Sequence, residues 1–209
     1  MVGSVSIGII GIQGAISEHF SILHNLNAQN VDQDNCNVSI IRDENELKQV
    51  DGLIIPGGES TTISRFLHRY GLGDVIKTRV EEKSLAVMGT CAGCVILAKR
   101  LCNQDKDVFL LELMDMEVKR NAFGRQKQSF EHCIDISNVC FSFPAVFIRA
   151  PSITTVWGSC KLLASIDEKG VMARQGNMLA VSFHPELTMD LRLHLYFLAM
   201  VQQLKERNF

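Results

Sequence analysis

Apolar and polar positions along the chain predict strands and helices in turn. In the first half, short apolar and β-branched runs end at glycine or proline, and stretches with helical spacing follow them. The expected strands are 5–10, 37–42, 52–55 and 85–88, and the expected helices are 15–26, 62–70 and 91–99. Strands that alternate with helices favour a parallel sheet with helical crossovers.

The second half has a different pattern, with strand-like runs separated by short turns. These runs are 116–120, 129–136, 145–149, 161–166, 171–175 and 179–183. Turns this short favour antiparallel pairing. Residues 190–205 predict a closing helix that packs on the sheet. We therefore expect an α/β fold with a mixed, mainly parallel central sheet flanked by helices. Because no repeat or linker interrupts residues 1–209, we expect a single domain, with an exposed loop at 27–37.

Composition narrows the class of protein. The chain has 209 residues, of which 46% are hydrophobic and 21% charged, and its net charge is −2. Lysine and arginine do not cluster, so no nucleic-acid partner is expected. The apolar runs are too short to span a membrane, and the first residues lack the basic segment of a signal peptide. Seven cysteines without a secretion signal favour free thiols in a reducing, cytoplasmic compartment.

The segment Gly89-Thr90-Cys91-Ala92-Gly93 lies where a strand is expected to turn into a helix. Glycines two residues on either side of the cysteine permit the tight turn of a nucleophile elbow. The start of the helix stabilises a thiolate, and the N–H of Ala92 can donate to an oxyanion that forms beside the sulfur. This pattern makes Cys91 a candidate nucleophile.

A candidate base follows the last expected strand. His184 comes directly after the run 179–183, and Glu186 lies two residues further on, within reach of orienting the imidazole. Nucleophile, base and orienting carboxylate together define a catalytic triad. The loops after Ile55, Met88 and Phe183 should meet at the carboxyl edge of the sheet, where ligands of open α/β sheets bind.

Other interpretations of Cys91 compete with this one. Cys91 and Cys94 form a CxxC motif, as in a thioredoxin-like redox pair, and a buried inert cysteine is also common. The redox interpretation leaves His184 and Glu186 without a role. A zinc site from Cys91, Cys94 and the pair His132-Cys133 is disfavoured, because adjacent ligands do not have the spacing of a zinc knuckle.

The glycine-rich segment 56–61, Pro-Gly-Gly-Glu-Ser-Thr, can be a plain turn or a functional loop. It has no lysine in the position that a phosphate-binding loop requires. In the functional interpretation, the N–H of Gly58 supplies a second oxyanion donor. Arg120 and Arg149 lie at expected strand ends, where either could pair with a substrate carboxylate or simply remain solvated.

These motifs together resemble the class I, triad-type glutamine amidotransferases, and in particular the glutaminase subunits of pyridoxal 5′-phosphate synthase. The resemblance covers nearly the whole chain. Its motifs are Ile-Gln-Gly-Ala at 12–15 with Glu18-His19, the segment 56–61, the elbow, Arg-Asn-Ala-Phe-Gly-Arg-Gln at 120–126, Phe-Ile-Arg-Ala-Pro at 147–151 and Phe-His-Pro-Glu-Leu-Thr at 183–188.

The resemblance implies that Cys91 attacks L-glutamine with His184 and Glu186 as its partners, releasing ammonia and glutamate. The residues implied to line the glutamine site are Gly58, Glu59, Ser60, Arg120, Ile148 and Arg149. It implies no cofactor and no metal. The implied partner is a (β/α)8-barrel synthase subunit, which we expect to activate the chain by fixing the flexible Gly57-Gly58 turn.

Two alternatives stay open beside this resemblance. One is a glutaminase of the same fold that serves another synthase, against which the segments 120–126 and 147–151 argue. The other is a non-enzymatic thiol sensor built on the same scaffold, which the intact triad disfavours.

Overall fold

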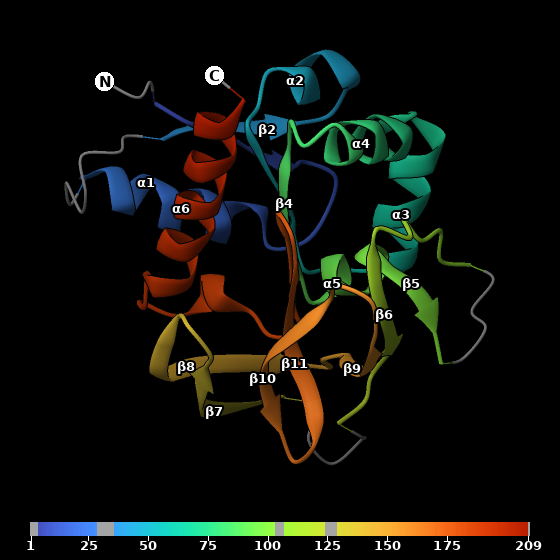
Figure 1. The fold of residues 1–209 in the computed structure, drawn as a ribbon, viewed down its shortest axis with the longest axis vertical. Helices are drawn as coiled ribbons and strands as arrows, with labels where there is room; N and C mark the ends of the chain where they lie inside the picture. The colour runs from blue at the N-terminus through green and yellow to red at the C-terminus, as the bar shows by residue number, and fades with distance from the viewer. Residues whose placement is uncertain (1–3, 29–35, 103–106, 124–128, 209) are drawn as a thin grey trace.

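The computed structural model describes residues 4–28, 36–102, 107–123 and 129–208 (Figure 1). Its strands are β1 Ser6–Ile10, β2 Asn37–Ile41, β3 Gly52–Ile55, β4 Ala86–Thr90, β5 Ala98–Leu101, β6 Met114–Lys119, β7 Ser129–Ile136, β8 Cys140–Ile148, β9 Ser152–Val156, β10 Lys161–Ile166, β11 Lys169–Gln175 and β12 Met178–Val181. Its helices are α1 Ile16–Ala28, α2 Glu44–Lys48, α3 Ser60–Arg69, α4 Leu72–Glu81, α5 Ala92–Leu97, a 3-10 turn η1 Pro185–Leu187 and α6 Arg192–Arg207.

The central sheet mixes parallel and antiparallel strands, as predicted. Its order is β2-β1-β3-β4-β12-β11-β9-β6-β5, with β10 added to β11. Strands β1 to β4 and β12 pair in parallel, and β9, β10 and β11 supply the antiparallel part. β12 therefore lies parallel to β4, so the segments that follow these two strands leave the same edge of the sheet.

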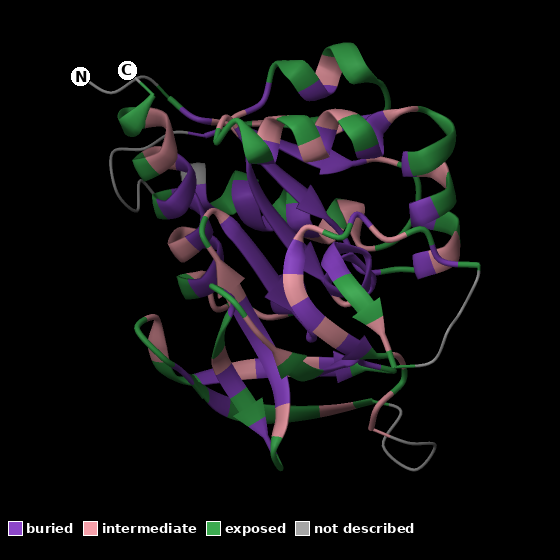
Figure 2. Cartoon of the chain, turned by 45° about the vertical axis from the view of Figure 1, so that its right-hand side comes forward, coloured by how far each residue is buried: buried purple, intermediate pink, exposed green. Residues whose placement is uncertain are grey.

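Helices cover both faces of the sheet, on either side of β4 in Figure 1. On one face, α1 and α6 pack with Leu23, Phe197 and Val201 against the strands. On the other face, α3, α4 and α5 contribute Ile63, Ile76 and other apolar residues to a second core. Figure 2 shows the buried residues along the strands and the exposed ones on the outer sides of the helices. This burial of one apolar face per helix is the main stabilising contribution.

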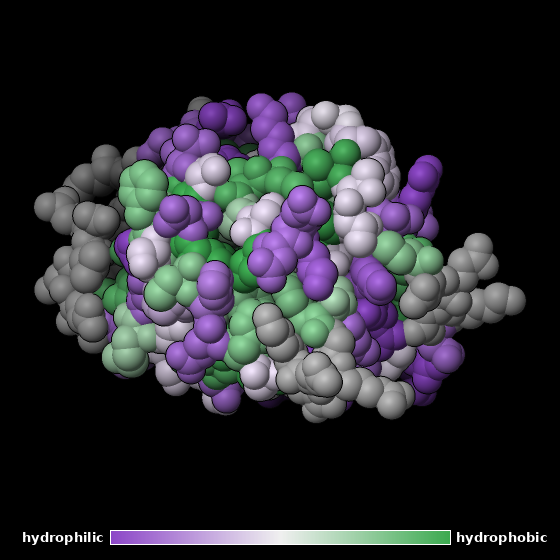
Figure 3. Space-filling model, turned by 90° about the horizontal axis from the view of Figure 1, so that it is seen from below, coloured by the Kyte–Doolittle hydropathy of each residue, from purple (hydrophilic) through white to green (hydrophobic). Residues whose placement is uncertain are grey.

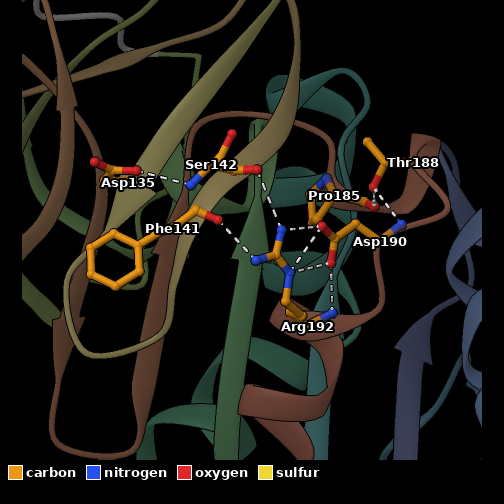
Figure 4. Close-up of polar contacts among 7 residues, drawn as sticks. All are labelled: Asp135, Phe141, Ser142, Pro185, Thr188, Asp190 and Arg192. Carbon is orange, nitrogen blue, oxygen red and sulfur yellow. Dashed lines mark hydrogen bonds and ion pairs between the residues drawn. The ribbon is translucent and has the colours of Figure 1, made fainter.

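β7 and β8 form a separate two-stranded antiparallel sheet that packs with the α1–α6 side. Arg192, at the start of α6, ties this hairpin to the chain that follows η1 (Figure 4). Its guanidinium donates to the backbone oxygen of Phe141 at 2.8 Å and to Asp190 Oδ1 at 2.9 Å. Thr188 donates back to the Pro185 oxygen at 3.1 Å. These contacts hold the turn after Glu186 in one conformation.

Several elements differ from the sequence prediction. The helix expected over 91–99 ends at Leu97, and Ala98 begins β5, so this prediction was wrong at its end. The reason is tertiary, because Ala98 pairs with Met114 of β6. The sequence pattern also missed α2, α4 and β9. β8 begins at Cys140, earlier than expected.

Parts of two further predictions lie outside the described residues. They are most of the loop at 27–37, and Gly124 to Gln126 of the motif at 120–126. Of the helices in the described ranges, none is long and apolar enough to cross a membrane. On the side of the molecule that carries β7 and β8, apolar and polar residues are interspersed (Figure 3).

Candidate active site

Cys91 occupies the sharp corner between β4 and α5. Its backbone has φ 47° and ψ −97°, a left-handed conformation that non-glycine residues rarely adopt. The flanking glycines permit the close packing that this corner needs. A Cβ on Gly89 would lie 2.5 Å from the Gly93 backbone, and one on Gly93 would lie 2.1 Å from the Ile55 oxygen. The structure thus has the strained elbow that the sequence pattern predicts.

The two cysteines of the CxxC motif differ in environment. Cys91 is partly exposed, and its Sγ lies 3.9 Å from the Ile148 oxygen. Cys94 is fully buried under the sheet, and burial raises the pKa of its thiol to about 12. Both are free thiols. A thiol so resistant to ionisation is a poor redox partner, and Cys94 belongs to the core.

The zinc interpretation also finds no support in the geometry. His132 and Cys133 are exposed on β7. Of the residues that the structure describes, no three from the His, Cys, Asp and Glu types are grouped as metal ligands.

His184 and Glu186 lie at the end of β12 and at η1. The backbone N–H of His184 donates to the backbone oxygen of Val146 at 2.8 Å, which fixes the main chain at His184. His184 Nδ1 lies 2.6 Å from Glu186 Oε1, and the two residues are only 7% and 5% exposed. The short contact indicates that His184 Nδ1 carries a proton and donates it to the Glu186 carboxylate, so His184 Nε2 is the nitrogen available for proton transfer.

The electrostatics of this pair favour a charged imidazole. Burial alone lowers the pKa of His184, but hydrogen bonds with Cys91 and Glu186 and their negative charges outweigh it and raise this pKa to about 10. Burial likewise raises the pKa of Glu186, whereas His19 and His184 lower it, and the net pKa is below its ordinary value. A protonated His184 beside the Cys91 sulfur is therefore favoured near neutral pH.

The three loops expected to converge do so around a pocket of about 250 Å³. The predicted residues that line it are Cys91, Ala92, His184, Gly58, Glu59, Ser60, Arg120, Ile148 and Arg149. Among the described residues, Glu186 does not line the pocket but contacts His184 Nδ1. Among the described residues that line the pocket, four were not predicted as site residues, namely Gln13, Val95, Asn121 and Pro151.

The segment 56–61 is held tightly from several sides. The Gly57 N–H donates to Thr90 Oγ1 at 3.0 Å, and the Gly57 oxygen accepts from Ala15 N–H at 3.0 Å. The Glu59 N–H donates to Gln13 Oε1 at 3.0 Å. Gly57 also packs on the triad, because a Cβ there would lie 2.4 Å from His184 Cε1. The motif at 12–15 thus supports the loop of the predicted oxyanion donor.

The two arginines have different settings. Arg120 Nη2 lies 3.3 Å from Glu59 Oε1, across the pocket mouth. Arg149 is exposed and has a left-handed φ of 44°. Cations and a carboxylate around one pocket match the two charged ends of an amino acid.

Comparisons with known proteins agree with this architecture. A sequence model of the SNO glutamine amidotransferase family matches residues 9–203. A pyridoxal 5′-phosphate synthase subunit PdxT from Brevibacillus brevis is 45% identical over 95% of this chain and 98% of its own. One from Anoxybacillus flavithermus is 44% identical over 97% of this chain and 100% of its own.

A solved structure gives the same result. A crystal structure described as a glutamine amidotransferase is 40% identical, with a TM-score of 0.85, over 93% of this chain and 98% of that one. The chain therefore belongs to the SNO glutamine amidotransferase family, and its fold is that of a class I glutamine amidotransferase.

Proposed function

We propose that the chain hydrolyses L-glutamine to L-glutamate and ammonia through a thioester on Cys91, and that the ammonia supplies a synthase that makes pyridoxal 5′-phosphate. The observation that carries this proposal is the elbow cysteine beside a His184 whose Nδ1 is 2.6 Å from Glu186. The names of relatives 45% and 44% identical over nearly the whole chain support the choice of synthase. Residues 1–209 act as one glutaminase domain, and the cytoplasm is the proposed location.

The substrate fits the pocket by charge. Arg149 and Arg120 are the cations that would meet the glutamine carboxylate, and Glu59, which pairs with Arg120 at 3.3 Å, is the anion that would meet its ammonium group. Gly58, Ser60 and Ile148 also line this pocket. In this pose the carboxamide reaches Cys91 and the N–H groups of Gly58 and Ala92.

The chemistry then runs in two halves. The Cys91 thiolate attacks the carboxamide carbon, and the oxyanion is stabilised by the N–H groups of Gly58 and Ala92. His184 gives its Nε2 proton to the leaving nitrogen, so ammonia departs and a γ-glutamyl thioester remains. His184 then takes a proton from water, which attacks the thioester and frees glutamate. Glu186 keeps the imidazole in the required tautomer throughout.

Ammonia that escapes into neutral water is largely protonated, so its release is useful only beside an acceptor. We therefore propose a docked (β/α)8-barrel synthase subunit as the partner. We also propose that the partner raises glutaminase activity by fixing the Gly57–Gly58 peptide in the orientation that points the Gly58 N–H at the oxyanion, which replaces the orientation in which the Gly57 carbonyl accepts from Ala15 N–H at 3.0 Å.

The test is glutamate release by the purified chain, alone and titrated with the barrel subunit from the same organism. The expected result is weak hydrolysis alone, strong hydrolysis in the complex, and transfer of the amide-¹⁵N of labelled glutamine into pyridoxal 5′-phosphate. Cys94→Ala is the matched control for Cys91→Ala. Hydrolysis without transfer to this product would indicate another synthase, and the absence of hydrolysis in any mixture would contradict the proposal.

A further inference from the structure

His19, on α1, is a buried histidine directly behind the triad that the mechanism above does not use. Its side chain is fully buried. Its Nε2 lies 3.4 Å from Glu186 Oε2 and 3.2 Å from Thr90 Oγ1. Its Nδ1 lies 3.2 Å from Nε2 of His194, which is also fully buried. His19 thus joins α1, β4, η1 and α6 at one point.

Hydrogen-bond requirements assign a specific task to this side chain. His184 Nδ1 contacts Glu186 Oε1, whereas Oε2 is buried and has no hydrogen-bond partner among the residues that the structure describes. His19 Nε2 lies 3.4 Å from this Oε2, within ion-pair distance. A buried carboxylate oxygen without a donor is costly. His19 Nε2 approaches this oxygen, so the proton of His19 belongs on Nε2. Its Nδ1 then accepts from His194 Nε2–H.

The charged and titratable groups around His19 agree with a neutral ring. They are Glu186, Glu18, His184 and His194. Burial lowers the pKa of His19, and the attraction of Glu186 offsets this only in part. A neutral Nε2–H can donate to the Glu186 carboxylate without adding a second positive charge beside His184.

His19 also reaches the other half of the site. Thr90 Oγ1, at 3.2 Å from His19 Nε2, accepts the Gly57 N–H at 3.0 Å. The same imidazole therefore contacts the triad carboxylate and the hydroxyl that anchors the oxyanion loop. It does so from outside the pocket, because His19 is not among the lining residues.

We infer that His19 is a positioning residue for glutamine hydrolysis: its Nε2–H holds Glu186 Oε2, so that Oε1 presents His184 correctly to Cys91. This inference rests on the proposed glutaminase function. A positioning group acts in the transition state and leaves substrate binding unchanged. Its loss should therefore lower kcat and leave KM for glutamine in place.

The experiment compares three variants with the unmodified chain, all in complex with the barrel subunit. His19→Leu removes the donor, and His19→Gln places an amide N–H where Nε2 was. Leu23→Val is the matched control, because Leu23 is fully buried one turn further along α1 without a polar contact to the triad. We expect His19→Leu to lower kcat about tenfold or more with KM changed less than about twofold, and His19→Gln to recover most of the loss. Leu23→Val should keep the unmodified kcat.

The pH profile gives a readout that a purely structural role would not move. Because an N–H donor beside Glu186 Oε2 stabilises the ionised carboxylate, the acid limb of kcat should shift to higher pH in His19→Leu. A kcat in His19→Leu equal to that of the unmodified complex would overturn the inference, as would equal losses in His19→Leu and His19→Gln. If the unmodified complex itself hydrolyses no glutamine, the proposed function has failed instead.

A measurement on the unmodified chain covers the case in which His19→Leu does not fold. Imidazole ¹⁵N chemical shifts report which ring nitrogen carries the proton. We expect His19 to be neutral near pH 7 with its proton on Nε2. A His19 with its proton on Nδ1 cannot donate to Glu186, and that result would overturn the inference regardless of activity.

Discussion

Substitution of Gly14 should disturb the segment 56–61, which carries the predicted oxyanion donor Gly58, more than it disturbs the rest of the fold. The φ of Gly14 is +105°, and a Cβ there would lie 1.8 Å from the Gly57 oxygen. This is 1.6 Å short of the 3.4 Å at which ordinary contact begins. Gly14→Ala must therefore displace the Gly57 carbonyl, which Ala15 N–H holds at 3.0 Å.

The expected cost has two parts. Alanine at this φ costs about 1–3 kcal/mol, and the lost backbone hydrogen bond costs about 1 kcal/mol. We expect the free energy of unfolding to fall by about 2–4 kcal/mol. Displacement of Gly57 also moves the Gly58 N–H, and a lost oxyanion donor typically lowers kcat on the order of a hundredfold. KM for glutamine should change much less.

The assay pairs urea unfolding with glutamate release in the synthase complex. Gly176→Ala is the matched control, because Gly176 also has a positive φ, +58°, but nothing lies within 4 Å of the position that its Cβ would take. This control should lose about 1 kcal/mol and keep its kcat. If Gly14→Ala behaves like Gly176→Ala in both measurements, the close approach of Gly14 to Gly57 does not position the site.

Three further predictions test the chemistry. Cys91→Ala should abolish glutamate release without unfolding the chain, whereas Cys94→Ala should retain most activity; equal inactivation of both would revive the redox interpretation. Glu186→Gln should lower kcat about a hundredfold or more, and Arg120→Ala should instead raise KM about tenfold; steady-state kinetics with the opposite pattern would refute both roles. Burial lowers the pKa of His194 to about 3, so the neutral imidazole stabilises the fold above pH 6.5, and this contribution is lost as the pH falls. The free energy of unfolding should therefore decrease by about 2 kcal/mol between pH 7 and pH 5. A free energy of unfolding that does not change over this range would contradict the buried neutral state.

Local pattern was sufficient to predict the parallel strands and the elbow. The strands 52–55 and 85–88 are short, apolar and bounded by glycine or proline, and their carboxyl ends meet in any parallel sheet. The convergence of Cys91 and His184 therefore followed from topology. The glycines around Cys91 were equally informative. A glycine is required where another backbone segment approaches too closely for a Cβ, as Ile55 approaches Gly93.

Other elements depend on contacts that a sequence pattern does not contain. α4 was missed because Gly71 and Gly73 resemble a loop, whereas Gly73 is helical and packs under Leu111, 3.2 Å from the position its Cβ would take. β5 forms because Ala98 finds a partner strand in Met114.

The positions of His19 and Gln13 also required the tertiary structure. His19 meets Thr90 and His194 across 71 and 175 residues of chain. Gln13 belonged to a recognisable motif, but its contact with the Glu59 N–H appears only when α1 and the 56–61 loop are packed together. The signal for Gln13 was the motif itself, without a role attached.

Covalent labelling by a γ-glutamyl electrophile tests most directly whether Cys91 is the nucleophile. The chain carries seven cysteines, so the reagent has seven thiols to choose from. We expect one adduct, on Cys91, in peptide mass mapping, with glutamate release lost in proportion to labelling and free glutamine protecting the thiol. An adduct on another cysteine, or full labelling of Cys91 with hydrolysis intact, would contradict this expectation.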